Sequence, residues 1–329
     1  MMPARLRTSP ATAFAVLTAA ALAVFVWSMM SGSVPLTTDQ VWTAIAGSQP
    51  SLASDVVREL RLPRAMSALA VGGLLAVSGA LLQALLRNPL ADPYVLGVSG
   101  GASVAALLAI LAGWTAAAVD GAAAVGAFAT CLLVFALSHG PGGWTPARLL
   151  LTGVVVASGA GAIVSLLLAL SDDFRLRGMV FWLLGDLSRG ERWTWLIALL
   201  LVVTAVCTAL GRHVNVLARG ELQAATVGMR VRRTQLLIFA LTSLLTGCAV
   251  SAAGSIGFVG LVTPHLVRLG VGSDHRVLLP ASALLGGVLL MVADLAARTV
   301  IAPRQLPVGA LTALVGVPLF LLLMSRRPR

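Results

Sequence analysis

The chain has 329 residues, of which 58% are hydrophobic and only 11% are charged, with a net charge of +11. A soluble domain of this length cannot bury so much apolar surface, so the composition predicts a membrane protein. All 23 basic residues are arginine. This excludes a phosphate-binding P-loop, a Schiff-base lysine and Ser–Lys catalysis, because each of these needs a lysine. If ATP drives this protein, another chain binds the ATP.

Apolar segments of membrane-spanning length recur along the whole chain. We expect an all-α, polytopic membrane protein with ten transmembrane helices in a single domain over residues 1–329. A shorter apolar segment at residues 256–271 decides the number of spans, since nine remain if it does not cross. The predicted spans lie near residues 11–31, 61–86, 97–113, 118–138, 147–170, 193–211, 235–253, 256–271, 278–299 and 307–324.

The distribution of arginine predicts the orientation of these spans. With ten spans and a cytoplasmic N-terminus, 14 of the 23 arginines fall inside, together with three of the 12 acidic residues. The positive-inside rule favours this arrangement, so both termini are expected to be cytoplasmic. The positive net charge is therefore a sign of membrane topology. Nucleic-acid binding would need one basic soluble surface, which the sequence does not provide.

Residues 61–101 combine a charged beginning, an apolar run and a polar break. Arg61 and Arg64 are one helical turn apart, so both are expected to project from one side at the outer end of the second span. Either these arginines extend to the membrane interface, or they form an electrostatic socket for an acidic partner. Arg298, at the outer end of the ninth span, favours the socket, unless it pairs with Asp294 four residues earlier.

The sequence NPLADP, residues 88–93, interrupts the helix at the inner end of the second span. Pro89 and Pro93 lack an amide hydrogen and disfavour helix in the residue before them. Non-helical backbone at membrane depth is tolerated only inside protein or beside a water-filled cavity. Leu90 is an unusual residue for a solvated loop, so we interpret the break as an inner gate. The entry to the fifth span, residues 144–146, is a second candidate constriction.

The largest inner connection, residues 212–234, contains the sequence GELQAATVG at residues 220–228. This stretch predicts a short helix between two glycines, which is too polar to insert into the membrane. Flanking arginines would hold it at the anionic inner surface. Two interpretations stay open: an amphipathic helix that lies on the membrane, or a docking element for a cytoplasmic partner.

The remaining motifs give little sign of metal or catalytic chemistry. His265 and His275 have no cysteine or carboxylate cluster beside them, so we expect no metal site. The three cysteines lie within apolar segments at spacings that fit neither a disulfide framework nor a zinc site. The glycine-rich segment 254–271 predicts an interrupted span of the kind that transporters use. A shared R-x-x-R before the spans at 61–86 and 235–253 is a weak sign of inverted-repeat-like halves.

Together these residues resemble the FecCD-type permeases, the membrane subunits of ATP-binding-cassette importers for iron–siderophores, haem and vitamin B12. The resemblance covers essentially the whole chain. Its most specific parts are RNPLADPYVLGVSGGAS (87–103), GELQAATVG (220–228), GSIGFVGLVTPHLVRL (254–269) and LPVGALTALVGVPLFLLLM (306–324).

The resemblance implies a ten-helix subunit that works as a dimer, with itself or with a related permease, and a substrate path along the two-fold axis. It implies three groups of functional residues. Arg61, Arg64 and Arg298 would dock a substrate-binding protein; Asn88, Pro89, Leu90, Thr145 and Pro146 would form the cytoplasmic gate; Gly220, Glu221, Leu222, Ala224, Ala225 and Gly228 would engage the ATPase. Leu222 stands where the family often has an acid, and Val227 stands where leucine is usual.

The resemblance also implies a bacterial plasma-membrane location, no enzyme activity, and no cofactor in this chain, because the partner ATPase binds ATP and Mg²⁺. An iron(III)–siderophore is the expected cargo, and haem or vitamin B12 is the alternative. An ion-coupled secondary transporter is a distant alternative, since it usually needs an ionisable residue deep in the membrane. Asp294 is the deepest acid here. A membrane-embedded enzyme would need a nucleophile–base pair, paired carboxylates or a metal cluster, which we do not find in the sequence.

Overall fold

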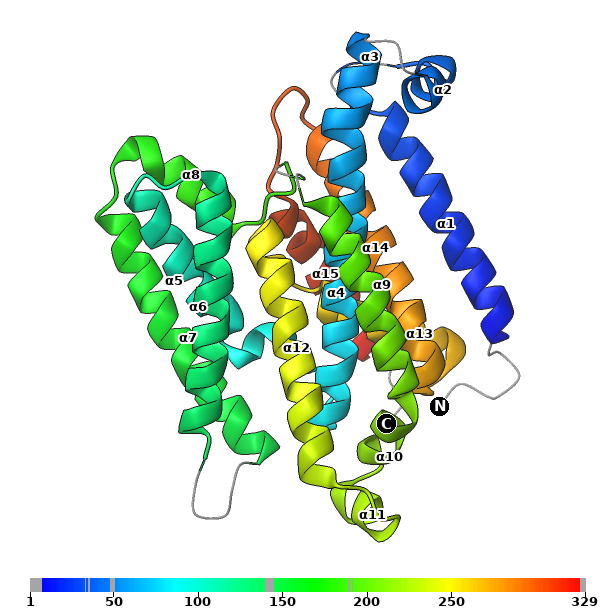
Figure 1. Ribbon diagram of the computed structural model, residues 1–329, viewed down its shortest axis with the longest axis vertical. Coiled ribbons are helices and arrows are strands. Elements are labelled where there is room, and N and C mark those ends of the chain that lie inside the picture. The colour runs from blue at the N-terminus through cyan, green and yellow to red at the C-terminus, as the bar shows by residue number, and fades with distance from the viewer. Residues whose placement is uncertain are drawn as a thin grey trace.

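A computed structural model describes residues 8–32, 34, 36–47, 51–139, 145–188, 190 and 192–325. Within these ranges the chain is helical and contains no strand (Figure 1). The helices are α1 (Pro10–Met30), α2 (Thr38–Ala46), α3 (Leu52–Asp55), a π-helical turn (Val56–Arg61), α4 (Leu62–Leu86), the 3₁₀ turn η3 (Pro93–Leu96), α5 (Val98–Leu111), α6 (Ala116–Leu137), α7 (Pro146–Ala169), α8 (Asp173–Leu183), α9 (Trp193–Ala209), α10 (Gly211–Ala218), α11 (Glu221–Thr226), α12 (Val231–Ala253), α13 (Val259–Val271), α14 (His275–Thr299) and α15 (Val308–Ser325).

Each of the ten predicted spans coincides with a helix, which confirms the all-α, polytopic fold. Six helical segments are long and apolar enough to cross a bilayer alone, and α9 with α10 makes a seventh candidate that is bent by 57°. The other three, α5, α13 and α15, are apolar but shorter. The number of ten crossings therefore stays a prediction, because three of the ten helices are short for a full span.

The connections contain helices that the sequence analysis did not predict. On one side of the bundle, α2 begins with a capping box in which Thr37 and Gln40 satisfy each other's backbone N–H groups. Helix α3 and the π-helical turn then run without interruption into α4, so that one helix extends over residues 52–86. Helix α8 lies in the connection 171–193. These short helices lie outside the apolar segments, so hydropathy did not reveal them.

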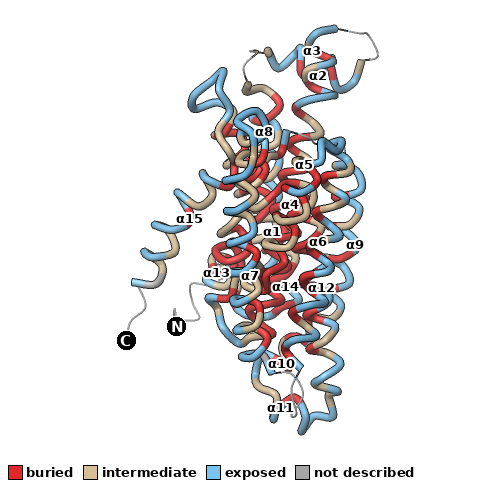
Figure 2. The backbone as a smooth tube through the Cα atoms, turned by 90° about the vertical axis from the view of Figure 1, so that its left-hand side faces the viewer, coloured by how far each residue is buried: buried red, intermediate tan, exposed pale blue. Residues whose placement is uncertain are grey.

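Helix α4 is the centre of the bundle (Figure 2), where 89% of the residues in its most apolar stretch are buried. Two glycine pairs let neighbouring helices approach it closely. A methyl group on Gly72 would overlap the carbonyl oxygen of Gly286 in α14, and one on Gly79 would overlap that of Gly260 in α13. Small residues are needed here because lipid provides no hydrophobic drive for helices to associate. Close packing between the helices must stabilise the bundle instead.

Two copies of one arrangement run in opposite directions in Figure 1: a long helix, a break and a short helix. The first copy is α4, η3 and α5, and the second is α12, residues 254–258 and α13. In both copies a left-handed residue precedes the short helix, Gly97 with φ 75° and Phe258 with φ 69°. This agrees with the inverted-repeat-like halves that the sequence predicted.

Candidate functional site

The two breaks meet inside the bundle through Tyr94, the only tyrosine of the chain. Its hydroxyl accepts a hydrogen bond from the Ile256 N–H at 3.0 Å and donates one to the Ile256 carbonyl at 3.1 Å. Beside it, the hydroxyls of Ser99 and Ser255 are 3.1 Å apart. One side chain thus satisfies both backbone groups of a residue that has left its helix. The sequence analysis missed this role, although a tyrosine within the break was a signal for it.

The first break is a structured turn rather than a loose loop. Helix α4 ends at Arg87, whose φ of 51° is left-handed and uncommon for a side chain of this size. The Asn88 side-chain oxygen then accepts the Leu90 N–H at 2.9 Å, and Asp92 accepts the Tyr94 N–H at 2.8 Å. Burial raises the pKa of Asp92 to about 6, against the lowering effect of the Tyr94 hydrogen bond.

The structure brings part of the predicted gate and part of the predicted coupling segment to one cavity of about 450 Å³. Its lining residues are Leu86, Arg87, Asn88, Thr145, Ala147, Leu150, Glu221 and Gln235. Thr145 caps α7 by accepting the Arg148 N–H at 3.3 Å. Pro89 lines a different, neighbouring cavity. Leu90 is 40% exposed, and the side chain of Pro146 lies outside the described residues.

The predicted coupling segment is indeed a short helix between glycines. Gly220 and Gly228, with φ values of 128° and 79°, stand on either side of α11 in conformations that other residues avoid. Ala224 is fully buried under the helix, and Ala225 is exposed. Leu222 is also exposed, by 80%, as an apolar side chain at the inner end of the bundle. The helix thus anchors one face on the protein and leaves the other free.

A polar link joins α11 to the gate. Arg87, the residue before Asn88, forms an ion pair with Glu221 at 3.5 Å, and Gln235 of α12 donates to the same Glu221 oxygen at 3.1 Å. Arg87 and Glu221 are each 45% exposed. This ion pair links α11 to the end of α4. The sequence analysis did not identify Arg87, which is 134 residues from Glu221, or Gln235, which belongs to the following helix α12.

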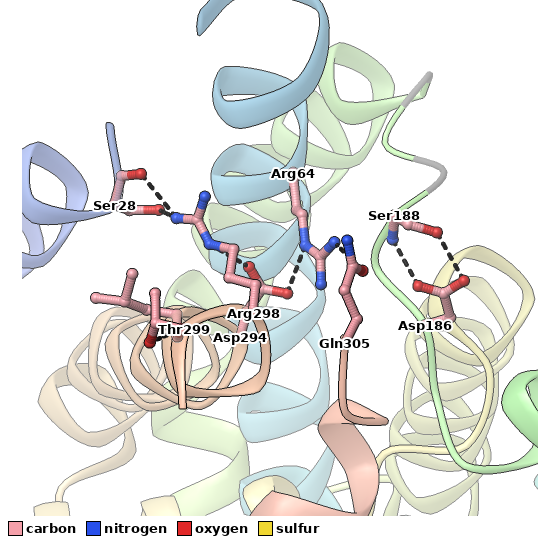
Figure 3. A network of polar contacts seen from close by, with 9 residues as sticks. Ser28, Arg64, Asp186, Ser188, Asp294, Arg298, Thr299 and Gln305 are labelled. Atoms are coloured by element: carbon pink, nitrogen blue, oxygen red, sulfur yellow. Dashed lines mark hydrogen bonds and ion pairs between the residues drawn. The ribbon is translucent and has the colours of Figure 1, made fainter. Parts of the chain in front are cut away.

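At the opposite end of the bundle, Asp294 holds two of the predicted docking arginines (Figure 3). Its carboxylate is 2.7 Å from Arg64 Nε and 3.7 Å from Arg298 Nε, and it is only 1% exposed. Arg64 also donates to Gln305 at 2.9 Å, and Arg298 donates to the Ser28 carbonyl at 2.7 Å. The pairing of Arg298 with Asp294 was the alternative that the sequence analysis left open, and it is confirmed.

The outer arginines also donate hydrogen bonds to backbone carbonyls at the ends of neighbouring helices. Arg61 donates to the carbonyls of Met29, at 2.6 Å, and Val34, where α1 ends. Arg58 donates to Ala44 at 2.6 Å, where α2 ends. Cations are favourable at helix C-termini, whose carbonyls lack partners. Arg61 and Arg64 are thus buried in this chain rather than projecting freely from it, and their docking role stays a prediction.

The chain matches the model of the FecCD transport family over residues 19–326. It is 46% identical over 282 residues to the cobalamin import system permease protein BtuC of Halobacterium salinarum, which covers 84% of this chain and 75% of that protein. It is 41% identical over 276 residues to the hemin transport system permease protein HmuU of Yersinia pestis, with 82% of each chain covered.

A solved structure, a metal-chelate type ABC transporter in an inward-facing conformation, has a TM-score of 0.86 and 32% sequence identity to this chain. The likeness covers 97% of this chain and 100% of that one. From its apolar helices and these relatives, we conclude that the protein is a multi-pass protein of the cytoplasmic membrane. The chain therefore belongs to the FecCD transport family, as a permease subunit of an ABC importer.

Proposed function

We propose that the chain forms half of a translocation path for an iron(III)–siderophore complex, with a partner ATPase driving alternating access. The observation that supports a metal chelate as the cargo is the whole-chain likeness to a metal-chelate type ABC transporter. A siderophore complex is a bulky metal chelate, as are haem and cobalamin. Haem or cobalamin is the second candidate, favoured by the names of two relatives with more than 40% identity.

Cargo is tested by growth and uptake with and without this chain. A strain that lacks the chain is expected to lose growth under iron limitation when single siderophores are supplied, and to lose uptake of the corresponding radioactive iron complex. Uptake of haem and cobalamin is measured in the same strain. Loss confined to haem or to cobalamin would replace the siderophore as cargo, and normal uptake of all three would remove the metal-chelate proposal.

The cavity beside Asn88 and Thr145 supports the proposed mechanism. The proposal is that α11 contacts the ATPase through its exposed face and that nucleotide-driven closure moves it. Because Glu221 is paired with Arg87 and bonded to Gln235, this movement pulls on the end of α4 and on the start of α12. The turn that begins at Asn88 then opens or closes the inner end of the path. ATP hydrolysis belongs to the partner, and this chain contributes the path.

Replacing Glu221 by Gln is expected to lower substrate transported per ATP by about two- to fivefold, since the link from α11 to α4 loses its charge. The half-exposed ion pair contributes only about 0–1 kcal/mol to stability, so the protein should fold normally. The measurement compares uptake with ATP hydrolysis in proteoliposomes that contain the assembled importer.

The matched control for this change is Glu59→Gln, which removes an exposed acid near the start of α4. A charge swap, Arg87→Glu with Glu221→Arg, is expected to restore at least part of the lost coupling. Unchanged transport per ATP in Glu221→Gln would mean that the ion pair does not couple the two elements.

The proposed docking surface for the binding protein is the end of the bundle that carries Arg61, Arg64 and Arg298. These side chains have partners within the chain. To contact acidic residues of the binding protein, these arginines would either keep their partners within the chain or exchange them for the new carboxylates. An Arg64→Glu change would place two carboxylates together at Asp294, so charge reversal there tests folding as well as docking.

A further inference from the structure

A second cavity at the inner end of the bundle, of about 710 Å³, shares Arg87 and Pro89 with the coupling link and the predicted gate, but its other lining residues have no role in the mechanism above. It lies between the end of α4, helix α10, the end of α13 and the start of α14, which meet in the lower part of Figure 1. Its lining is polar and basic: Gln83, Ala84, Arg87, Pro89, Asn215, Ala218, Arg219, Arg268, Ser273, Asp274 and His275.

The charge of this cavity favours an anion. Its lining contains three arginines, of which Arg87 is already paired with Glu221, and a single carboxylate, Asp274. Asp274 already accepts hydrogen bonds from Asn215 at 2.7 Å and from the Arg276 N–H at 3.0 Å. These two bonds lower the pKa of Asp274. Among the described residues, Arg219 has no ion-pair partner, and Arg268 donates one hydrogen bond, to Gln83 at 3.0 Å. The guanidinium groups of both arginines therefore have donors available for a ligand.

The floor of the cavity is built from buried polar side chains. Gln83 is 3% exposed and His275 is 4% exposed. His275 Nδ1 lies 2.7 Å from the Asn215 side-chain oxygen, which can only accept, so the proton is assigned to Nδ1. Nε2 is then an acceptor, and it is buried without a partner among the described residues.

We propose that this cavity binds a phosphoester, with the phosphate held by Arg219 and Arg268. Arginine favours phosphate because its planar fork can make two parallel hydrogen bonds. Basic pockets between helices at the cytoplasmic side of a membrane are typical sites for anionic lipid head groups. The glycerol phosphate head group of phosphatidylglycerol has the required chemistry, and so does free glycerol 3-phosphate.

The experiment measures binding to the full-length chain in nanodiscs of phosphatidylcholine. The two probes are glycerol 3-phosphate in solution and phosphatidylglycerol added to the nanodisc lipid, followed by thermal stabilisation and by native mass spectrometry. We expect binding of at least one probe, weakened at least about tenfold by Arg219→Gln with Arg268→Gln, because the double change removes both charge-assisted contacts to the phosphate.

Arg212→Gln is the matched control, since it removes an exposed arginine of α10 that does not line the cavity. It should leave the affinity unchanged. If the double variant fails to fold, the exposed Arg219→Gln alone is the test, and a several-fold loss of affinity is expected.

The two probes separate the two sources of the phosphoester. Binding of phosphatidylglycerol alone would assign the site to lipid, and binding of glycerol 3-phosphate would assign it to a soluble metabolite. The proposal is overturned if neither probe binds, or if Arg212→Gln weakens binding as much as the double variant does. It is also overturned if the double variant binds both probes as tightly as the unchanged chain does.

Discussion

Replacing Asp294 by Ala is expected to destabilise the folded protein by about 3–5 kcal/mol, enough to remove most folded material from the membrane. The change leaves two buried guanidinium groups, those of Arg64 and Arg298, without the carboxylate that both contact. Removing one partner of a buried ion pair destabilises a protein far more than replacing the whole pair by apolar residues, because the remaining charges stay desolvated. The measurement is the yield of monodisperse protein after extraction, together with its thermal unfolding midpoint.

Asp55→Ala, which removes an exposed acid at the end of α3, is the control and should change stability by less than about 0.5 kcal/mol. A triple variant with Arg64→Met, Asp294→Leu and Arg298→Met should fold again, since apolar residues of similar volume can replace a buried charge cluster. A stable Asp294→Ala protein would show that the cluster contributes little to the fold.

The triple variant also separates folding from docking. A folded triple variant that no longer transports and no longer binds the substrate-binding protein would support a docking role for Arg64 and Arg298. If it folds and transports normally, these two arginines act within the chain only. The charge reversal of Arg64 alone cannot make this distinction.

Replacing residues 221–226 by a Gly/Ser linker of equal length is expected to abolish association with the ATPase and all ATP-driven uptake. The linker removes the exposed apolar surface at Leu222 and the Glu221 contact with Arg87, and it leaves no helix to transmit force. The measurement is recovery of the ATPase with the tagged permease, followed by uptake in proteoliposomes.

The same linker in place of α2, Thr38–Ala46, is the control, because this short surface helix lies at the opposite end of the bundle (Figure 1). It should leave ATPase association intact. If the 221–226 linker still recovers the ATPase in normal amount, the contact lies elsewhere on the inner surface, and the proposed role of α11 is wrong.

Much of the fold could be predicted because local chemistry decides it. Hydropathy located all ten apolar helices, and proline with glycine located the breaks near Asn88 and Ser255. The glycine-bracketed helix α11 was predicted for the same reason: Gly220 and Gly228 mark where the backbone needs a left-handed or otherwise unusual conformation. Helices α2, α8 and α10 were not predicted, since each is short and its apolar pattern is too brief to stand out.

The sequence by itself determined that this chain is a membrane protein with a series of apolar helices, arginine-rich inner connections and two interrupted spans. These features are readable because the bilayer sets the length, polarity and flanking charge of each segment separately. Only the tertiary structure decided which distant groups meet. It joined Arg64 to Asp294 across 230 residues, Arg87 to Glu221 across 134, and Tyr94 to Ile256 across 162. The reason is physical: a buried charge or a broken backbone must find a partner, and the packing of helices around α4 decides which one is within reach.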